Sequence, residues 1–232
     1  MPKVQPTPVR RYAILASAVM VLFSPLLAMS YFATKDGAQM LTYASVRAWA
    51  KPARSLFEPM LTFASADHVY ATYSLLIALV IPALPLAAWA VRRARVPVAG
   101  TFERRASWVV AAAWTAFSAS LLVVAIALQV KPANASGNSV VNVVFLAGMI
   151  PSMVIGALGS APLGVSLLRH GFLPRTAGVL IVLALPLQIV GTGVLGHNSI
   201  GLFPQMIAWT LALSAVMKST GADVPLRSGS TG

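Results

Sequence analysis

Long apolar runs alternate with short polar or charged segments along almost the whole chain. A helix that crosses the hydrocarbon core of a bilayer needs about 20 mainly apolar residues. Six runs reach or approach that length, and no Asp, Glu, Lys, Arg or His lies inside any of them. The pattern predicts an all-α, polytopic membrane protein built as a six-transmembrane-helix bundle. The predicted spans are residues 12–33, 71–91, 107–130, 140–168, 176–196 and 200–217.

These spans predict one transmembrane helical domain over residues 1–219. The polar residues 220–232, which are rich in Gly and Ser, predict a flexible C-terminal tail. His197, Asn198 and Ser199 alone separate the fifth run from the sixth. We therefore expect these two spans to form a tight antiparallel hairpin.

Composition excludes several classes of protein. Hydrophobic residues make up 58% of the 232 residues, charged residues only 9%, and the mean hydropathy is +0.80. Soluble domains carry roughly a quarter charged residues, so this composition argues against a water-soluble enzyme or a disordered chain. The chain has no cysteine, which excludes disulfides, thiolate nucleophiles and thiolate metal sites.

The net charge of +12 would suit a nucleic-acid-binding protein, but the bases stand at the ends of the apolar runs, and we expect no nucleic-acid partner. Short cytoplasmic loops of membrane proteins are enriched in Lys and Arg. With the N-terminus inside, twelve bases are cytoplasmic and five are external, which predicts a multi-pass protein with cytoplasmic N- and C-termini. The external five are Lys35, Arg47, Lys51, Arg54 and Lys131.

The first external loop, residues 34–70, is long enough to fold. Apolar residues at helical spacing, together with Arg47, Lys51 and Arg54 at i, i+4 and i+7, predict a short interfacial helix. Pro52 should end this helix near Lys51, because the residue before proline avoids the α region. The helix would either touch anionic headgroups or a partner, or cap the mouth of the bundle.

Small residues recur at every fourth position of the fourth span. This small-xxx-small pattern permits close helix packing, and it predicts that the span is the central helix of the bundle. The residues are Gly148, Ser152, Gly156, Ser160 and Gly164.

Polar amides gather near the predicted external ends of the later spans. The hairpin brings Gln188 and Gln205 to similar depths, and a buried amide in hydrocarbon needs a partner. We expect either an interhelical hydrogen bond or a ligand pocket beneath His197, covered by the first loop near His68. The candidate pocket residues are Gln129, Asn142, Gln188, Asn198 and Gln205.

Asp67, His68 and His197 are the candidate catalytic residues, since two histidines and a carboxylate can act as acid and base. The residues predict no metal site and no cofactor. The leading hypothesis is a non-catalytic integral membrane protein that binds a lipophilic or small ligand, or an accessory subunit of a membrane complex. The alternatives are a membrane-embedded enzyme acting on a lipid or isoprenoid at the outer interface, and a small-solute transporter. Expected partners are membrane lipids and a protein within the membrane.

Overall fold

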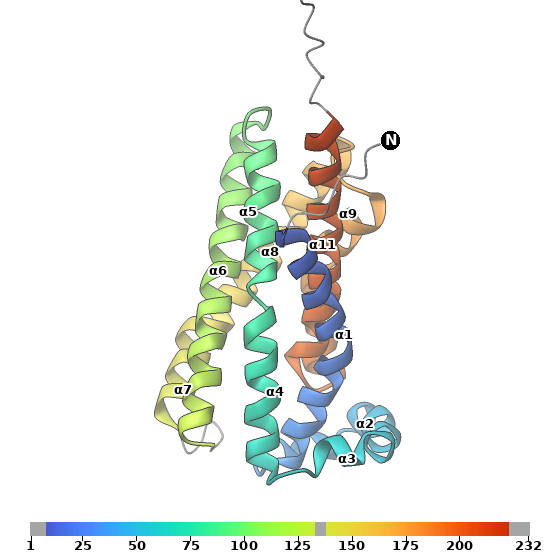
Figure 1. Ribbon diagram of the computed structural model, residues 1–232, viewed down its shortest axis with the longest axis vertical. Helices are drawn as coiled ribbons and strands as arrows, with labels where there is room; N and C mark the ends of the chain where they lie inside the picture. The colour runs from blue at the N-terminus through green and yellow to red at the C-terminus, as the bar shows by residue number, and fades with distance from the viewer. Residues whose placement is uncertain (1–7, 133–137, 223–232) are drawn as a thin grey trace, which may run out of the picture.

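The computed structural model of the chain describes residues 8–132 and 138–222 (Figure 1). The described residues form helices joined by short turns, and they contain no strand. This confirms the predicted all-α class. The long helices run roughly along one axis and form an elongated bundle.

Five helical segments of the described residues are long and apolar enough to cross a membrane. The first is α1, and the second consists of α4 and α5, with a break at Ile81 and Pro82. The third is α6, the fourth contains α7, the π-helical turn η2 and α8, and the last is α11. Their bounds are Pro8–Ala33 for α1, Ala66–Val80 for α4, Ala83–Arg95 for α5, Thr101–Val130 for α6, Ser139–Val144 for α7, Phe145–Met149 for η2, Ile150–Arg169 for α8 and Asn198–Ala222 for α11.

The segment predicted as the fifth span is a bent helix. It contains α9 (Arg175–Val182), α10 (Ala184–Ile189) and the π-helical turn η3 (Val190–Val194). The axis turns by 60° at the break around Leu183. Pro186 explains the break, because it has no N–H to donate to the carbonyl of residue 182, four positions earlier.

The bundle is arranged around α1, α6 and α11. Helix α1 lies against α4 and α11, and α6 lies against α5 and α8, while α9 lies between α8 and α11. The N-terminus of α1 and the C-terminus of α11 are at the same end, together with the turn between α5 and α6 (Figure 1). The core between the helices includes the fully buried side chains of Met20, Trp114, Phe117, Met206 and Trp209.

The fourth span is not the central helix that its small residues predicted. Of its most apolar window 28% is buried, whereas the other four long segments bury 44–56%. One side of α8 contacts α6 and α9, and the opposite side exposes Ile155 and Leu158. Four-residue spacing of small residues indicates that one face of a helix is closely packed. A helix that packs on one face only can lie at the edge of the bundle.

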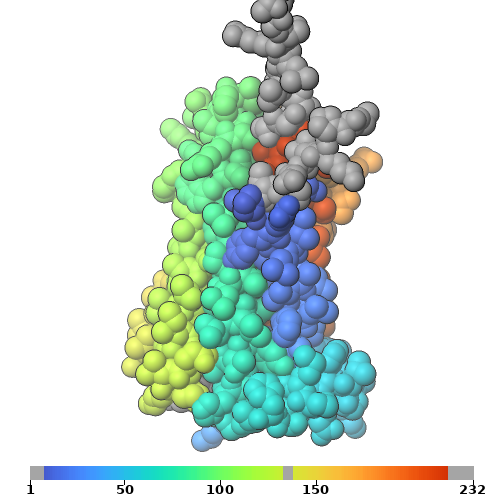
Figure 2. All heavy atoms as spheres, in the orientation of Figure 1, coloured from blue at the N-terminus to red at the C-terminus, as the bar shows by residue number. Residues whose placement is uncertain are grey.

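The first long loop folds into a layer of short helices at the other end of the bundle (Figures 1 and 2). It contains η1 (Ala38–Thr42), α2 (Ala44–Leu56) and α3 (Glu58–Leu61). The expectation that Pro52 ends the helix near Lys51 is wrong, because α2 continues through Pro52 to Leu56. Pro52 removes the donor for the carbonyl of Ala48, an exposed residue. The apolar face of α2 continues across the proline to Ala53.

The end of α11 lies beyond the predicted start of the C-terminal tail. Helix α11 extends to Ala222, three residues past the predicted boundary at 219. Residues 223–232, most of the predicted tail, lie outside the described residues.

Candidate functional site

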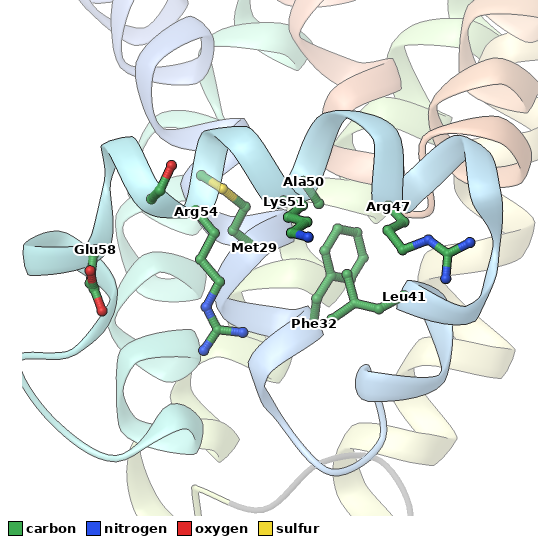
Figure 3. A pocket seen from close by; sticks show the side chains of 9 residues that line it. Met29, Phe32, Leu41, Arg47, Ala50, Lys51, Arg54 and Glu58 are labelled. Atoms are coloured by element: carbon green, nitrogen blue, oxygen red, sulfur yellow. The ribbon is translucent and has the colours of Figure 1, made fainter.

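A groove lies between α1 and α2 at the end of the bundle formed by the short helices (Figure 3). Its volume is about 450 Å³. We call it the α1–α2 groove. It is lined by Met29, Phe32, Leu41, Arg47, Ala50, Lys51, Arg54, Ser55 and Glu58.

The apolar face of α2 fixes one wall of this groove. Val46 and Ala50 of α2 are 1% and 3% exposed and form a small core with Ala28 and Phe32 of α1. The ring of Trp49 lies edge-on to Phe32, with the ring centroids 5.9 Å apart. These contacts hold α2 across the end of α1.

The turn after η3 holds the same wall from the other side. Trp49 Nε1 donates a hydrogen bond to the carbonyl of Leu195 at 3.3 Å. Gly196 follows with a φ of +83°, and a Cβ there would lie 2.8 Å from Val46 Cγ2. Glycine is required at this position both for the backbone conformation and for the close approach of α2.

Three cations lie along the open edge of the α1–α2 groove. Figure 3 shows Arg47, Lys51 and Arg54 on one side of α2, beside Met29 and Phe32 of α1. All three cationic side chains are exposed. Glu58, at the start of α3, is the carboxylate of the lining. The groove therefore combines an apolar floor with a predominantly positive edge.

The candidate catalytic residues lie in different environments. His197 is 9% exposed, and its ring centroid is 5.3 Å from that of Tyr31. His68 is exposed, and its Nδ1 lies 2.7 Å from the hydroxyl of Ser65, while Asp67 is half-buried. Within the described part of the chain, no hydrogen bond or ion pair joins His197 to Asp67 or His68.

Burial governs the ionisation of His197, which lies between η3 and α11. It lowers the pKa of His197 from its ordinary 6.5 to about 4. The backbone N–H of Ser199 donates to His197 Nδ1 at 3.2 Å, which places the proton of the neutral ring on Nε2. His197 is thus a neutral ring in a closed site.

Gln188 and Gln205 are both buried, at 5% and 1% exposure. Gln188 Nε2 donates to the carbonyl of Asn198 at 3.1 Å, and Gln205 Nε2 donates to the carbonyl of Leu180 at 2.9 Å. Within the described residues, the two side-chain oxygens have no hydrogen-bond partner. Each amide thus pairs with backbone rather than with the other amide.

Of the remaining amides, Asn198 contacts this pair through its backbone carbonyl, which accepts the hydrogen bond from Gln188. Gln129 is exposed and donates to the carbonyl of Ala71 in α4 at 2.7 Å. Asn142 is exposed, and Asn198 is half-buried at the start of α11. None of the five candidate amides lines the α1–α2 groove. The pocket beneath His197 stays a prediction.

The small residues of the fourth span face two neighbours. A Cβ at Gly148 would meet Ser120 of α6, one at Gly156 would meet the Trp114 ring of α6, and one at Gly164 would meet Val182 of α9. Ser152 and Ser160 are buried, and their hydroxyls donate to backbone carbonyls within α8 or η2.

A buried ion pair at the opposite end of the bundle was not anticipated from the sequence. Arg95 donates two hydrogen bonds to the carboxylate of Glu103, at 2.6 and 3.0 Å. Ser166 of α8 donates a third to Glu103 at 2.8 Å, and His170 Nδ1 lies 3.6 Å from the same carboxylate. The sequence does contain a hint of this ion pair, because Glu103 is one of only five acidic residues in the chain and follows Arg95 by eight positions.

No family model matches the chain, and neither a curated protein nor a solved structure is similar to it. Among the residues that the structure describes, no group of three or more His, Cys, Asp or Glu side chains is placed to hold a metal ion.

Proposed function

We propose that the chain is a non-catalytic integral membrane protein that holds a lipophilic ligand in the α1–α2 groove. The ligand class is an amphiphile with an acyl or similar apolar part and an anionic end. In this proposal the bent segment α9–α10–η3 crosses the bilayer as one span, which gives six spans. Both termini are cytoplasmic, and the short helix α2 lies in the outer interface.

The lining of the α1–α2 groove is the observation that carries the proposal. Its volume of about 450 Å³ is within the range of small-molecule sites, which are mostly apolar with a few placed polar groups. Met29, Phe32 and Leu41 offer an apolar floor. Arg47, Lys51 and Arg54 would then pair with the anionic end of the ligand.

Charge distribution supports the orientation. The basic turn between α5 and α6 and the turn between α8 and α9 are at the same end as the start of α1 (Figure 1). Placing this end in the cytoplasm satisfies the preference of Lys and Arg for short cytoplasmic loops. The α1–α2 groove then opens toward the outer side.

Lipid retention tests the proposal. The protein is purified in mild detergent, and co-purifying small molecules are identified by mass spectrometry. Ser55→Trp places a large ring in the α1–α2 groove, whereas Ala48→Trp adds the same ring to α2 at an exposed position outside the lining. We expect Ser55→Trp to reduce the retained amphiphile at least tenfold and Ala48→Trp to leave it unchanged.

Equal retention by the two variants would refute the groove as the binding site. If no amphiphile co-purifies and a membrane protein does so in stoichiometric amount, the chain acts as an accessory subunit and the ligand proposal is wrong.

A further inference from the structure

A second cavity of about 450 Å³ lies at the end of the bundle opposite the α1–α2 groove. It is formed by the hairpin of α5 and α6. We call it the α5–α6 cavity. It is lined by Arg92, Thr101, Arg104, Arg105, Trp108 and Val109.

The positive charge of the arginines in the α5–α6 cavity is not neutralised by Glu103, the acidic residue nearest in the chain. Glu103 is adjacent to Arg104 in the chain, but its carboxylate is buried and accepts hydrogen bonds from Arg95 and Ser166. Within the described residues, the ion pairs are those of Glu103 with Arg95 and with His170. Three guanidinium groups therefore line one cavity without a carboxylate among the lining residues, and an anion there would relieve their mutual repulsion.

One of the three guanidinium groups is held in place by the protein. Arg92 lies over the ring of Trp89, with its Cζ 5.4 Å from the ring centroid. Trp89 in turn donates a hydrogen bond from Nε1 to Thr115 of α6 at 3.0 Å. The Nε of Arg92 is buried and has no hydrogen-bond partner among the described residues. Arg92 is thus oriented before any ligand arrives.

The other half of the α5–α6 cavity is apolar and opens to the outside of the bundle. Trp108 is 53% exposed and Val109 is 39% exposed. They follow Arg104 and Arg105 by four residues, which is about 6 Å along the helix axis. Cations thus lie nearer the end of the bundle and apolar surface lies one turn deeper, in the order of a phospholipid headgroup and its acyl chains. Tryptophan is enriched at this level of the bilayer.

We propose that the α5–α6 cavity binds an anionic phospholipid of the adjacent leaflet. Arg92, Arg104 and Arg105 hold the phosphate, and an acyl chain lies along Trp108 and Val109. Basic pockets beside transmembrane helices recognise anionic headgroups in this way. A free phosphate ion would leave the apolar half of the cavity unused, which is why the proposal commits to a membrane lipid.

Native mass spectrometry of the delipidated protein tests the site. Phosphatidylglycerol and phosphatidylcholine of the same acyl composition are added in separate titrations. We expect the wild-type protein to bind phosphatidylglycerol at least tenfold more tightly. Arg104→Gln combined with Arg105→Gln should abolish this preference. The matched control, Arg93→Gln with Arg169→Gln, removes two exposed cations outside the lining and should retain it.

Two further measurements distinguish a lipid from a free anion and the α5–α6 cavity from the α1–α2 groove. Inorganic phosphate at 10 mM should not displace phosphatidylglycerol, and displacement would mean that the cavity takes a free anion. Ser55→Trp, in the α1–α2 groove, should leave the preference intact. Equal loss in both arginine pairs, or no preference for phosphatidylglycerol in the wild-type protein, would overturn the proposal, and the second result does not depend on the folding of any variant.

Discussion

Glu103 is a buried carboxylate whose charge is balanced by one neighbour. Its side chain is 4% exposed and that of Arg95 is 10% exposed, and the two are joined by two hydrogen bonds. Removing one partner of a buried ion pair is costly, because the other charge stays buried without compensation.

Glu103→Gln should therefore lower the free energy of unfolding by about 3 kcal/mol. Chemical denaturation in detergent micelles, followed by circular dichroism, measures the change. Glu58→Gln is the control, since Glu58 is exposed and its loss should change stability little. A Glu103→Gln protein as stable as the wild type would show that the ion pair does not contribute to the free energy of unfolding.

His197 gives stability a pH dependence. Its pKa in the folded protein is about 4 instead of the ordinary 6.5, so the folded state keeps a neutral ring where the unfolded chain takes up a proton. The contribution of the neutral His197 ring to the free energy of unfolding is complete above about pH 6.5, and it is lost progressively as the pH falls toward 4.

His197→Gln should flatten this dependence. Thermal unfolding in detergent between pH 7.5 and 4.5 compares the variant with the wild type, and His68→Gln, at an exposed position, serves as the control. Wild-type and His197→Gln proteins with the same loss of stability over this range would contradict the assignment.

At the level of elements, the contact between α8 and α6 depends on Gly156. A Cβ at this position would lie 3.0 Å from the Trp114 ring, and Trp114 is fully buried. A larger side chain must push the two helices apart.

Gly156→Leu should cost on the order of 1–3 kcal/mol through overpacking, measured as a shift of the thermal transition in detergent. Gly193→Leu adds the same side chain where a Cβ would meet nothing within 4 Å, and it should have a much smaller effect. Equal shifts would mean that the cost comes from the helix backbone rather than from the packing against Trp114.

The elements also show what the sequence can and cannot predict. The long helices follow from runs of apolar residues, because hydrocarbon admits few other structures. The path of α2 through Pro52 was not predictable from local rules, since it depends on the packing of Val46 and Ala50 against Phe32. The regular spacing around Gly156 indicated a packing face, but it could not show how many neighbours surround the helix.

The two cavities were partly visible in the sequence. The spacing of Arg47, Lys51 and Arg54 placed three cations on one face of a helix, but nothing in the spacing shows that Met29 and Phe32 lie beside them. In the α5–α6 cavity, Arg92 and Arg105 line the same space because two helices fold back on each other. Glu103 does not neutralise these cations, because it is paired with Arg95.

For the whole molecule, the orientation in the bilayer is open to direct measurement. The chain has no cysteine, so a single introduced cysteine is the only residue of the protein that a maleimide can label. Ser45→Cys lies at the start of α2, and Val98→Cys lies in the turn between α5 and α6, where Val98 is 72% exposed. An impermeant maleimide added to intact cells should label Ser45→Cys and not Val98→Cys.

Permeabilised cells provide the control, because both cysteines should then react. Labelling of Val98→Cys in intact cells, with Ser45→Cys protected, would reverse the proposed orientation. Labelling of both in intact cells would place the two positions on one side and contradict a crossing by α4 with α5, the long segment between them.

The ion pair between Arg95 and Glu103 also bears on biosynthesis. The two residues are eight positions apart, so their contact needs nothing beyond the turn that joins α5 to α6. A nascent chain can therefore pair this carboxylate as soon as the helical hairpin has formed, before α8 packs beside it and buries a charge that would be costly if unpaired. Ser166 comes 63 residues later, and its hydrogen bond to Glu103 joins a pair that the growing chain has already completed.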